Sequence, residues 1–305
     1  MVRNEPLPQR ALDAAAVEAM LRRAARHEEP PWLHAEVARR MGQRLSVIRL
    51  QPPWLIDWWG FSGAASTALA RAYPKAHRVI VEPTQALVDR SRAATRRAWW
   101  SAQRWRGAKV DVLLDGPGLP SGAPMIWSNM MLHAERDPPA LFARWHDLLQ
   151  IEGFVMFSCL GPGTLRELRE LYTKLGWPQP AAALVDMHDL GDMLVSAGFA
   201  DPVLDQETLT LHWAGAQALL AELRTLGANA APGRFSGLRT PRWRERLGQE
   251  LHALAGPDGR LRLSFEVAYG HAFKAAPRHR AGEPTTVTLQ DMRAMVRSHN
   301  SARRG

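Results

Sequence analysis

The stretch that most constrains the fold is residues 54–64, which read WLIDWWGFSGA. An apolar run ends there at Asp57, and a glycine-containing turn and a helix-like run follow it. A second apolar run, residues 79–81, ends at Glu82. The order of strand, glycine turn, helix, strand and acid is typical of proteins that hold a nucleotide-type cofactor at the carboxyl ends of parallel strands. We therefore expect an α/β sheet that begins at residue 54.

The chain up to residue 160 alternates between apolar runs and helical patterns, which predicts a parallel, doubly wound sheet. Its strands are expected at residues 54–57, 78–82, 109–114, 125–128 and 154–160. After residue 160 two long strands, 202–213 and 261–273, enclose helical stretches at 215–226 and 241–254. This order fits the α/β fold of class I methyltransferases, a Rossmann-like sheet with a C-terminal antiparallel hairpin, here with a helical lid insertion.

Three segments are predicted from these patterns. Residues 1–50 contain two helical stretches separated by a Pro-Pro pair and form an N-terminal helical arm. Residues 51–274 form the methyltransferase domain, with the lid insertion at about 214–260. Residues 275–305 are polar and basic, and we expect a mobile tail with a short helical piece near 289–297. Thr164 and Glu167 have the spacing of a capping box for a helix over 164–175.

The composition narrows the setting and the partners. The single cysteine, Cys159, allows no internal disulfide, and no apolar run approaches the length of a membrane span, so a cytoplasmic protein without membrane contact is expected. The net charge of +9 suits an acidic partner such as nucleic acid, anionic membrane or an acidic protein, or reflects compositional bias alone. The arginines are spread along helices and form no zinc-finger or RNA-recognition motif, which makes nucleic acid an unlikely partner.

Short motifs in the second half of the chain are more specific. They read WSN at 127–129, GFVMFS at 153–158, GPGTLREL at 161–168, HDLGD at 188–192 and LGAN at 226–229. With these motifs the chain resembles the malonyl-acyl carrier protein O-methyltransferases of biotin synthesis. The resemblance covers roughly residues 20–274, and before residue 127 it is one of fold only.

The resemblance implies a reaction, a cofactor and a partner. Members of that family transfer a methyl group from S-adenosylmethionine to the free carboxylate of malonyl-acyl carrier protein, and the carrier protein is acidic. The carboxylate is already a nucleophile, so positioning and removal of water are expected to carry the rate. No catalytic triad or metal site is predicted.

The resemblance also implies site residues. The cofactor is expected to contact Asp57 at the end of the first strand, Gly60 and Gly63 in the turn, Glu82 at the ribose, Asp115 near the adenine, and Ser128 and Asn129 near the reacting methyl group. Arg234 is the candidate cation for the malonyl carboxylate because arginine matches that group geometrically. His133, shortly after the fourth strand, is expected to line the substrate pocket.

The chain departs from the family pattern inside the turn. The family loop reads acid-x-Gly-x-Gly-x-Gly, and here its first two glycines are replaced by Trp59 and Phe61, while Gly60 restores one flexible position through a shifted turn. Two alternatives follow. The chain is a catalytically inactive binding protein with a methyltransferase fold, or it methylates another small carboxylate.

Overall fold

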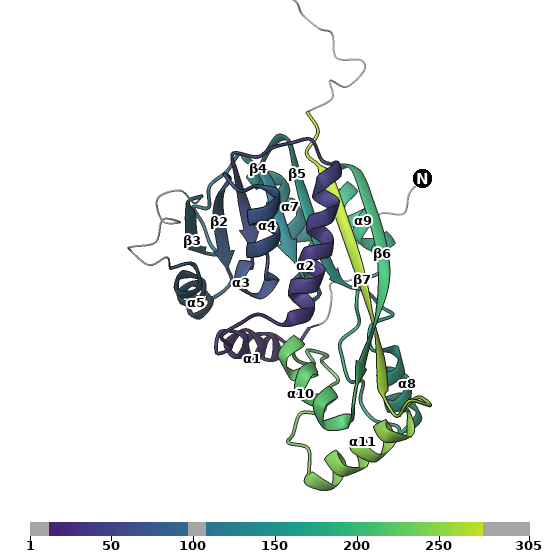
Figure 1. Ribbon diagram of the computed structural model, residues 1–305. Coiled ribbons are helices and arrows are strands. Elements are labelled where there is room, and N and C mark those ends of the chain that lie inside the picture. Colours follow the sequence, from purple (N-terminus) through teal and green to yellow (C-terminus); the bar gives the residue numbers. More distant parts are fainter. Residues whose placement is uncertain (1–11, 97–107, 277–305) are drawn as a thin grey trace, which may run out of the picture. The chain divides into compact units, whose positions relative to one another are not determined.

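A seven-stranded sheet forms the centre of the protein (Figure 1). The computed structural model describes residues 12–96 and 108–276. The chain divides into a large unit, Met1–Lys274, and a short unit, Ala275–Gly305. The predicted helix near 289–297 lies outside the described residues.

The strands run in the order β3-β2-β1-β4-β5-β7-β6. They are β1 (Trp54–Trp58), β2 (His77–Glu82), β3 (Val110–Leu114), β4 (Ala123–Asn129), β5 (Leu149–Leu160), β6 (Ala200–Trp213) and β7 (Leu261–Phe273). β1 to β5 pair in parallel, and β7 is antiparallel to both β5 and β6. The predicted α/β class I methyltransferase fold with a C-terminal antiparallel hairpin is therefore confirmed.

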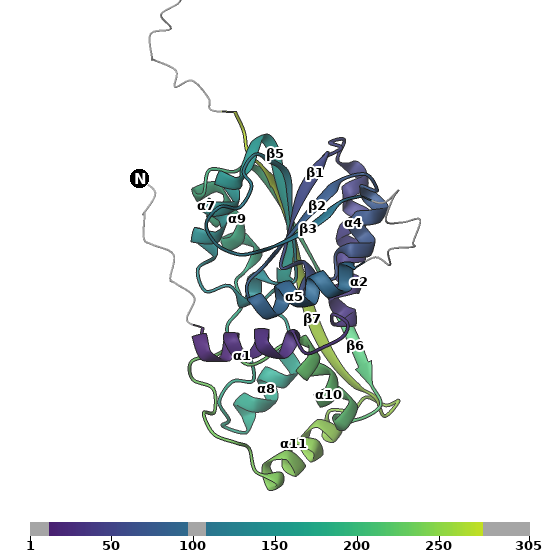
Figure 2. The same ribbon diagram turned by 90° about the vertical axis from the view of Figure 1, so that its left-hand side faces the viewer.

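Helices lie on both faces of the sheet (Figure 2). The helices are α1 (Ala14–Ala24), α2 (Trp32–Arg44), α3 (Gly60–Gly63), α4 (Ser66–Ala72), α5 (Gln85–Thr95), α7 (Pro138–Leu148), α8 (Arg166–Lys174), α9 (Met187–Ser196), α10 (Ala216–Leu226) and α11 (Pro241–Ala253). The described residues also contain two short 3-10 helices, Leu45–Val47 and Leu132–Ala134. Within the described ranges, no helix is long and apolar enough to cross a membrane.

The core has two halves, one on each face, because successive strand residues point to opposite sides. In β1, Ile56 and Trp58 pack into the half that α7 and α9 cover. Leu55, which lies between them in the chain, packs into the half that α2 and α4 cover. Cys159 is buried in the first half.

The hairpin of β6 and β7 carries the segment predicted as a lid. The two strands pair from Ala200 opposite Phe273 to Trp213 opposite Leu261, and α10 and α11 lie between them in the chain. Leu219 of α10 is buried in the same apolar cluster as Trp213 and Leu261. Figure 1 shows α8, α10 and α11 gathered around the far end of this hairpin, with α10 beside α1.

The capping box predicted at Thr164 is wrong. α8 begins at Arg166 after a left-handed Leu165, and no side chain caps it. The hydroxyl of Thr164 instead donates to the carbonyl oxygen of Glu266 at 3.0 Å, and Glu167 accepts from both the backbone and the hydroxyl of Ser264 in β7. These polar side chains fix α8 to the hairpin. Such contacts join residues far apart in the chain, so the spacing of Thr164 and Glu167 does not predict them.

Candidate functional site

The predicted glycine turn is a short helix. α3 (Gly60–Gly63) follows Trp59, whose φ of 56° is left-handed, and the N–H of Gly63 donates to the carbonyl oxygen of Trp59 at 2.8 Å. A Cβ at Gly60 would lie 2.6 Å from Oδ2 of Asp57, closer than real carbon atoms approach. Glycine at this position therefore allows the turn to lie directly on the acid that ends β1.

The carboxylate of Glu82 faces this turn and is fully buried. Its Oε1 accepts hydrogen bonds from the backbone N–H of Phe61 at 2.8 Å and from the hydroxyl of Ser91 at 2.5 Å. Its Oε2 has no hydrogen-bond partner among the residues described. Burial raises the pKa of Glu82 to about 8, against the opposing effect of the two donors, and Asp57 raises it further. The acid predicted at the ribose is thus tied to the turn.

Asp57 is a second buried acid at the same edge of the sheet. Its side chain is 1% exposed, and neither carboxylate oxygen has a hydrogen-bond partner within the described part of the chain. The nearest cation is Arg78, whose Nε lies 3.8 Å from Oδ2. Burial raises the pKa of Asp57 to about 6, and Arg78 works in the opposite direction. Buried polar atoms without partners are uncommon and require an explanation.

Ser128 and Asn129 end β4 next to β1, where the sequence places them, and both are fully buried. The Oγ of Ser128 has no hydrogen-bond partner among the described residues. The amide of Asn129 donates to the carbonyl oxygens of His34 at 2.8 Å and Gly63 at 2.6 Å. It accepts from the hydroxyl of Ser158 at 2.7 Å. Asn129 therefore joins the arm, the turn and β5, and its side chain is fully used within the protein.

Asp115 lies just beyond β3. Its Oδ1 pairs with a guanidinium nitrogen of Arg144 in α7 at 2.6 Å, and its backbone N–H donates to the carbonyl oxygen of Glu82 at 2.8 Å. Arg144 also stacks 5.1 Å from the centre of the Trp58 ring. The structure thus brings Asp115 beside the end of β2, and its predicted contact with an adenine stays a prediction.

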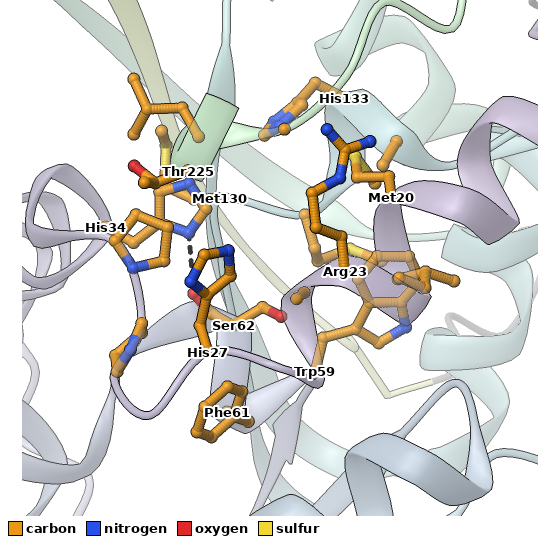
Figure 3. A pocket seen from close by; sticks show the side chains of 18 of the residues that line it. Met20, Arg23, His27, His34, Trp59, Phe61, Ser62, Met130, His133 and Thr225 are labelled. Carbon is orange, nitrogen blue, oxygen red and sulfur yellow. Dashed lines mark hydrogen bonds between the residues drawn. The ribbon is translucent and has the colours of Figure 1, made fainter. Parts of the chain in front are cut away.

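A narrow pocket opens above the carboxyl ends of β1 and β4 (Figure 3). Its walls come from α1 and the following connection, the turn after β1, the residues after β4, and the end of α10 at 224–227. The room for the centre of a water-sized sphere is about 50 Å³. Because one water needs roughly 10–15 Å³ on this measure, a few waters fit there and a nucleoside does not.

Three histidines line the pocket. His133 is one of them, and its predicted contact with the substrate stays a prediction; His27 comes from the connection after α1. His34, which the sequence analysis did not select, is buried, and its Nδ1 lies 2.7 Å from the carbonyl oxygen of Ser62 (Figure 3). Burial lowers the pKa of His34 to about 4 despite this contact. At neutral pH the His34 ring is therefore uncharged.

Arg234 does not line this pocket. Its guanidinium donates to Oδ2 of Asp13 at 2.7 Å, and the N–H of Asp13 donates to the carbonyl oxygen of Ala230. Asp13 also caps α1 by accepting from the N–H of Ala16. Arg234 thus ties the lid segment to the arm, and its predicted contact with the substrate stays a prediction.

The pocket also contains two arginines that were not predicted from the sequence. Arg23 of α1 and Arg224 of α10 both line the pocket, and Figure 3 shows Arg23 reaching in between Trp59 and His133. Arg23 is one of several arginines in the arm, and only the packing of α1 over the turn distinguishes it. No local sequence signal marks such a position.

The polar atoms at these strand ends fit the predicted cofactor, but the turn fits it poorly as it stands. Oε2 of Glu82, both oxygens of Asp57 and Oγ of Ser128 are buried polar atoms without hydrogen-bond partners in the described chain, and hydroxyl and ammonium groups of a ligand would pair with them. Trp59 and Phe61 are only 7% and 8% exposed, and both lie in the pocket wall. Their rings occupy space that glycines would leave open.

Two relatives share one name. A malonyl-[acyl-carrier protein] O-methyltransferase from Gallionella capsiferriformans is 37% identical over 272 residues, which are 88% of this chain and 93% of the relative. A protein of the same name from Laribacter hongkongensis is 33% identical over 92% of this chain and 94% of its own length. No protein-family model matches the chain.

Solved structures agree on the fold. The YcgJ protein from Bacillus subtilis has a TM-score of 0.51 at 12% identity, and the match covers 78% of this chain and 98% of that one. A putative methyltransferase from Bacillus halodurans has a TM-score of 0.50 at 11% identity, with the same coverage. At these identities the likeness shows the fold alone.

Proposed function

Because the chain belongs to the malonyl-[acyl-carrier protein] O-methyltransferase family, we propose that it converts the free carboxylate of malonyl-acyl carrier protein to a methyl ester, a step of biotin synthesis. The observation that carries this proposal is the 37% identity to a relative of that name over nearly the whole of both chains. The pocket at the carboxyl ends of β1 and β4 supports it, because open α/β sheets bind their ligands at this edge. We also propose that the protein is located in the cytoplasm.

S-adenosylmethionine is the proposed methyl donor, and when bound it supplies a methyl group on a positively charged sulfur. Glu82, Asp57 and Ser128 are the acceptors that would hold it, since each has a buried oxygen without a hydrogen-bond partner in the described chain. Asp115, Gly60 and Gly63 belong to the same edge. Room for a nucleoside requires that the turn after β1 shift, because the pocket as it stands holds only a few waters.

The protein has to orient the substrate carboxylate and exclude water from it. The pocket wall contains the apolar side chains of Met20, Met130 and Met131 as well as the histidines. A carboxylate stripped of water is a better nucleophile, and no side chain has to remove a proton from it. Positioning by the pocket walls is therefore the proposed source of the rate.

The lid offers a surface for an acidic carrier protein. Leu238 is 96% exposed and Phe235 is 46% exposed in the connection before α11. The guanidinium of Arg239 stacks 3.9 Å from the ring centre of Phe235, and Arg242 and Arg246 are exposed in α11. We call these five residues the lid patch. Apolar side chains surrounded by arginines suit a partner that is acidic and partly apolar.

A second function, binding without catalysis, is favoured by one specific observation. Phe61 and Trp59 fill the position of two family glycines, and the Phe61 N–H closes the turn over Glu82. A protein fixed in this arrangement binds the carrier protein but not the cofactor. A third possible function, methylation of another small carboxylate, would use the same cofactor with a different substrate.

Calorimetric titration with S-adenosylmethionine and with its demethylated product separates these functions. The proposed enzyme binds both ligands, and Glu82→Ala weakens both affinities because the ribose acceptor is lost. No heat at millimolar ligand, with the protein folded, contradicts the enzyme and leaves the binding protein. Binding of the cofactor followed by methylation of acetyl- and malonyl-carrier protein alike contradicts the malonyl substrate.

A further inference from the structure

Arg23 is a cation inside the pocket that no other described residue neutralises. It lies on α1, its side chain is partly buried, and it reaches into the pocket between Trp59 and His133 (Figure 3). Among residues 12–96 and 108–276, no hydrogen bond or ion pair of its guanidinium is found, whereas the neighbouring Arg22 pairs with Glu18 at 3.5 Å. A partly buried guanidinium without an anion is costly, and a bound anion relieves the cost.

We propose that Arg23 is the residue that recognises the free carboxylate of the substrate. This inference rests on the proposed function, because it assigns the group that selects a carboxylate in the same pocket. Arginine is suited to the role because it stays charged and its planar fork matches two carboxylate oxygens.

The other ionisable groups in or near the pocket are less suited to this role. His34 is uncharged at neutral pH, and its Nδ1 is engaged by the carbonyl oxygen of Ser62. Arg224 is exposed at the end of α10, where water competes for its charge. Glu29 also lines the pocket and carries the wrong sign for a carboxylate. Arg234 lies outside the lining and is paired with Asp13.

The surroundings of Arg23 strengthen an ion pair with a ligand. Met20 lies on the same helix and Met130 and Met131 follow β4, so thioether and hydrocarbon groups replace much of the water around the pocket. In such surroundings a charge-assisted hydrogen bond is stronger than at an open surface. A guanidinium that donates one N–H to each carboxylate oxygen leaves a further lone pair on each oxygen, and one of these lone pairs accepts the methyl group.

The test measures binding and needs no turnover. Malonyl-loaded and acetyl-loaded acyl carrier protein are titrated into the full chain by calorimetry, first with the wild type and then with Arg23→Ala and Arg23→Lys. Arg23→Ala is expected to weaken binding of the malonyl form by roughly 10- to 100-fold, the loss typical of one hydrogen bond to a charged group, and to leave the acetyl form unchanged. Arg23→Lys keeps the positive charge but loses the planar fork, so its affinity for the malonyl form is expected to lie between those of the wild type and Arg23→Ala.

Two matched variants serve as controls. Arg22→Ala removes an exposed arginine one position away on the same helix, and it is expected to change neither affinity. Arg234→Ala removes the cation predicted from sequence, and it is expected to leave the malonyl preference in place because Asp13 already neutralises that arginine. Thermal melts show that each variant is folded.

The outcomes separate this inference from the proposed function. A wild type that prefers malonyl over acetyl carrier protein, with a preference that survives Arg23→Ala, overturns the role of Arg23 alone. A preference that disappears with Arg234→Ala and not with Arg23→Ala assigns the role to Arg234, and it also overturns the role of Arg23 alone. A wild type without any preference overturns both the role of Arg23 and the malonyl substrate.

Discussion

Replacement of Gly60 by alanine tests the arrangement of the turn over Asp57. The added Cβ would lie 2.6 Å from Oδ2 of Asp57 and 2.9 Å from Cγ2 of Ile80, so the turn or the strand ends must move. Overpacking of this kind costs about 1–3 kcal/mol. A displaced turn also weakens the bond from the Phe61 N–H to Glu82, which is worth about 0.5–1.5 kcal/mol because Glu82 is uncharged at neutral pH.

A gain in helix propensity offsets part of this loss. Alanine is up to about 1 kcal/mol better than glycine inside a helix, so the expected net loss for Gly60→Ala is about 1–3 kcal/mol in the free energy of unfolding. Urea unfolding followed by fluorescence measures it, since the chain contains 12 tryptophans.

Gly248→Ala is the matched control. Gly248 lies in α11, and nothing approaches within 4 Å of a Cβ built on it. The same substitution there keeps the propensity gain without the clash, and we expect unchanged or higher stability, by up to about 1 kcal/mol. A Gly60→Ala variant as stable as Gly248→Ala would show that the turn does not rest on Asp57 in the way described.

Three further predictions concern two buried ionisable groups and the lid patch. The pKa of Glu82 is raised to about 8, so an unfolded chain releases that proton near pH 4.5 while the folded chain keeps it up to about pH 8. The stability of the wild type therefore falls as the pH rises from 4.5 to 8. Over that range the melting temperature of Glu82→Gln should rise relative to that of the wild type. The pKa of His34 is lowered to about 4, so its contribution is lost as the pH falls from 6.5 towards 4, and His34→Gln should flatten that part of the profile, whereas an unchanged slope would contradict the buried neutral ring. Leu238→Ser combined with Arg242→Glu should weaken carrier-protein binding by roughly tenfold, and an affinity that is unaffected by either change or by added salt would exclude the lid patch.

Much of the fold is predictable from the sequence because the strands are apolar runs with clear ends. β1 and β2 end within one residue of the predicted positions, since Asp57 and Glu82 mark the change from apolar to charged. β5 begins at Leu149, five residues before its predicted start at 154, because its first residues follow α7 without a break and Leu149 pairs with Ala123. Pairing of that kind depends on the neighbouring strand and leaves no local pattern.

The site is less predictable than the fold. Four residues of helix in α3 are too short to give a periodic signal, so the turn reads as a loop in sequence. Sequence places Arg234 near a substrate, and the structure pairs it with Asp13, a contact between segments 221 residues apart. Arg23 is distinguished from Arg22 only by the side of α1 that faces the pocket. Long-range packing decides each of these cases.

The most direct test of the central claim is the mass of the carrier protein after incubation with the full chain and S-adenosylmethionine. Our account predicts that malonyl-acyl carrier protein gains the mass of one methyl group and that acetyl-acyl carrier protein, which has no free carboxylate, gains none. An unchanged mass of the malonyl form, with folded protein and saturating donor, would contradict the assignment as a carboxyl methyltransferase.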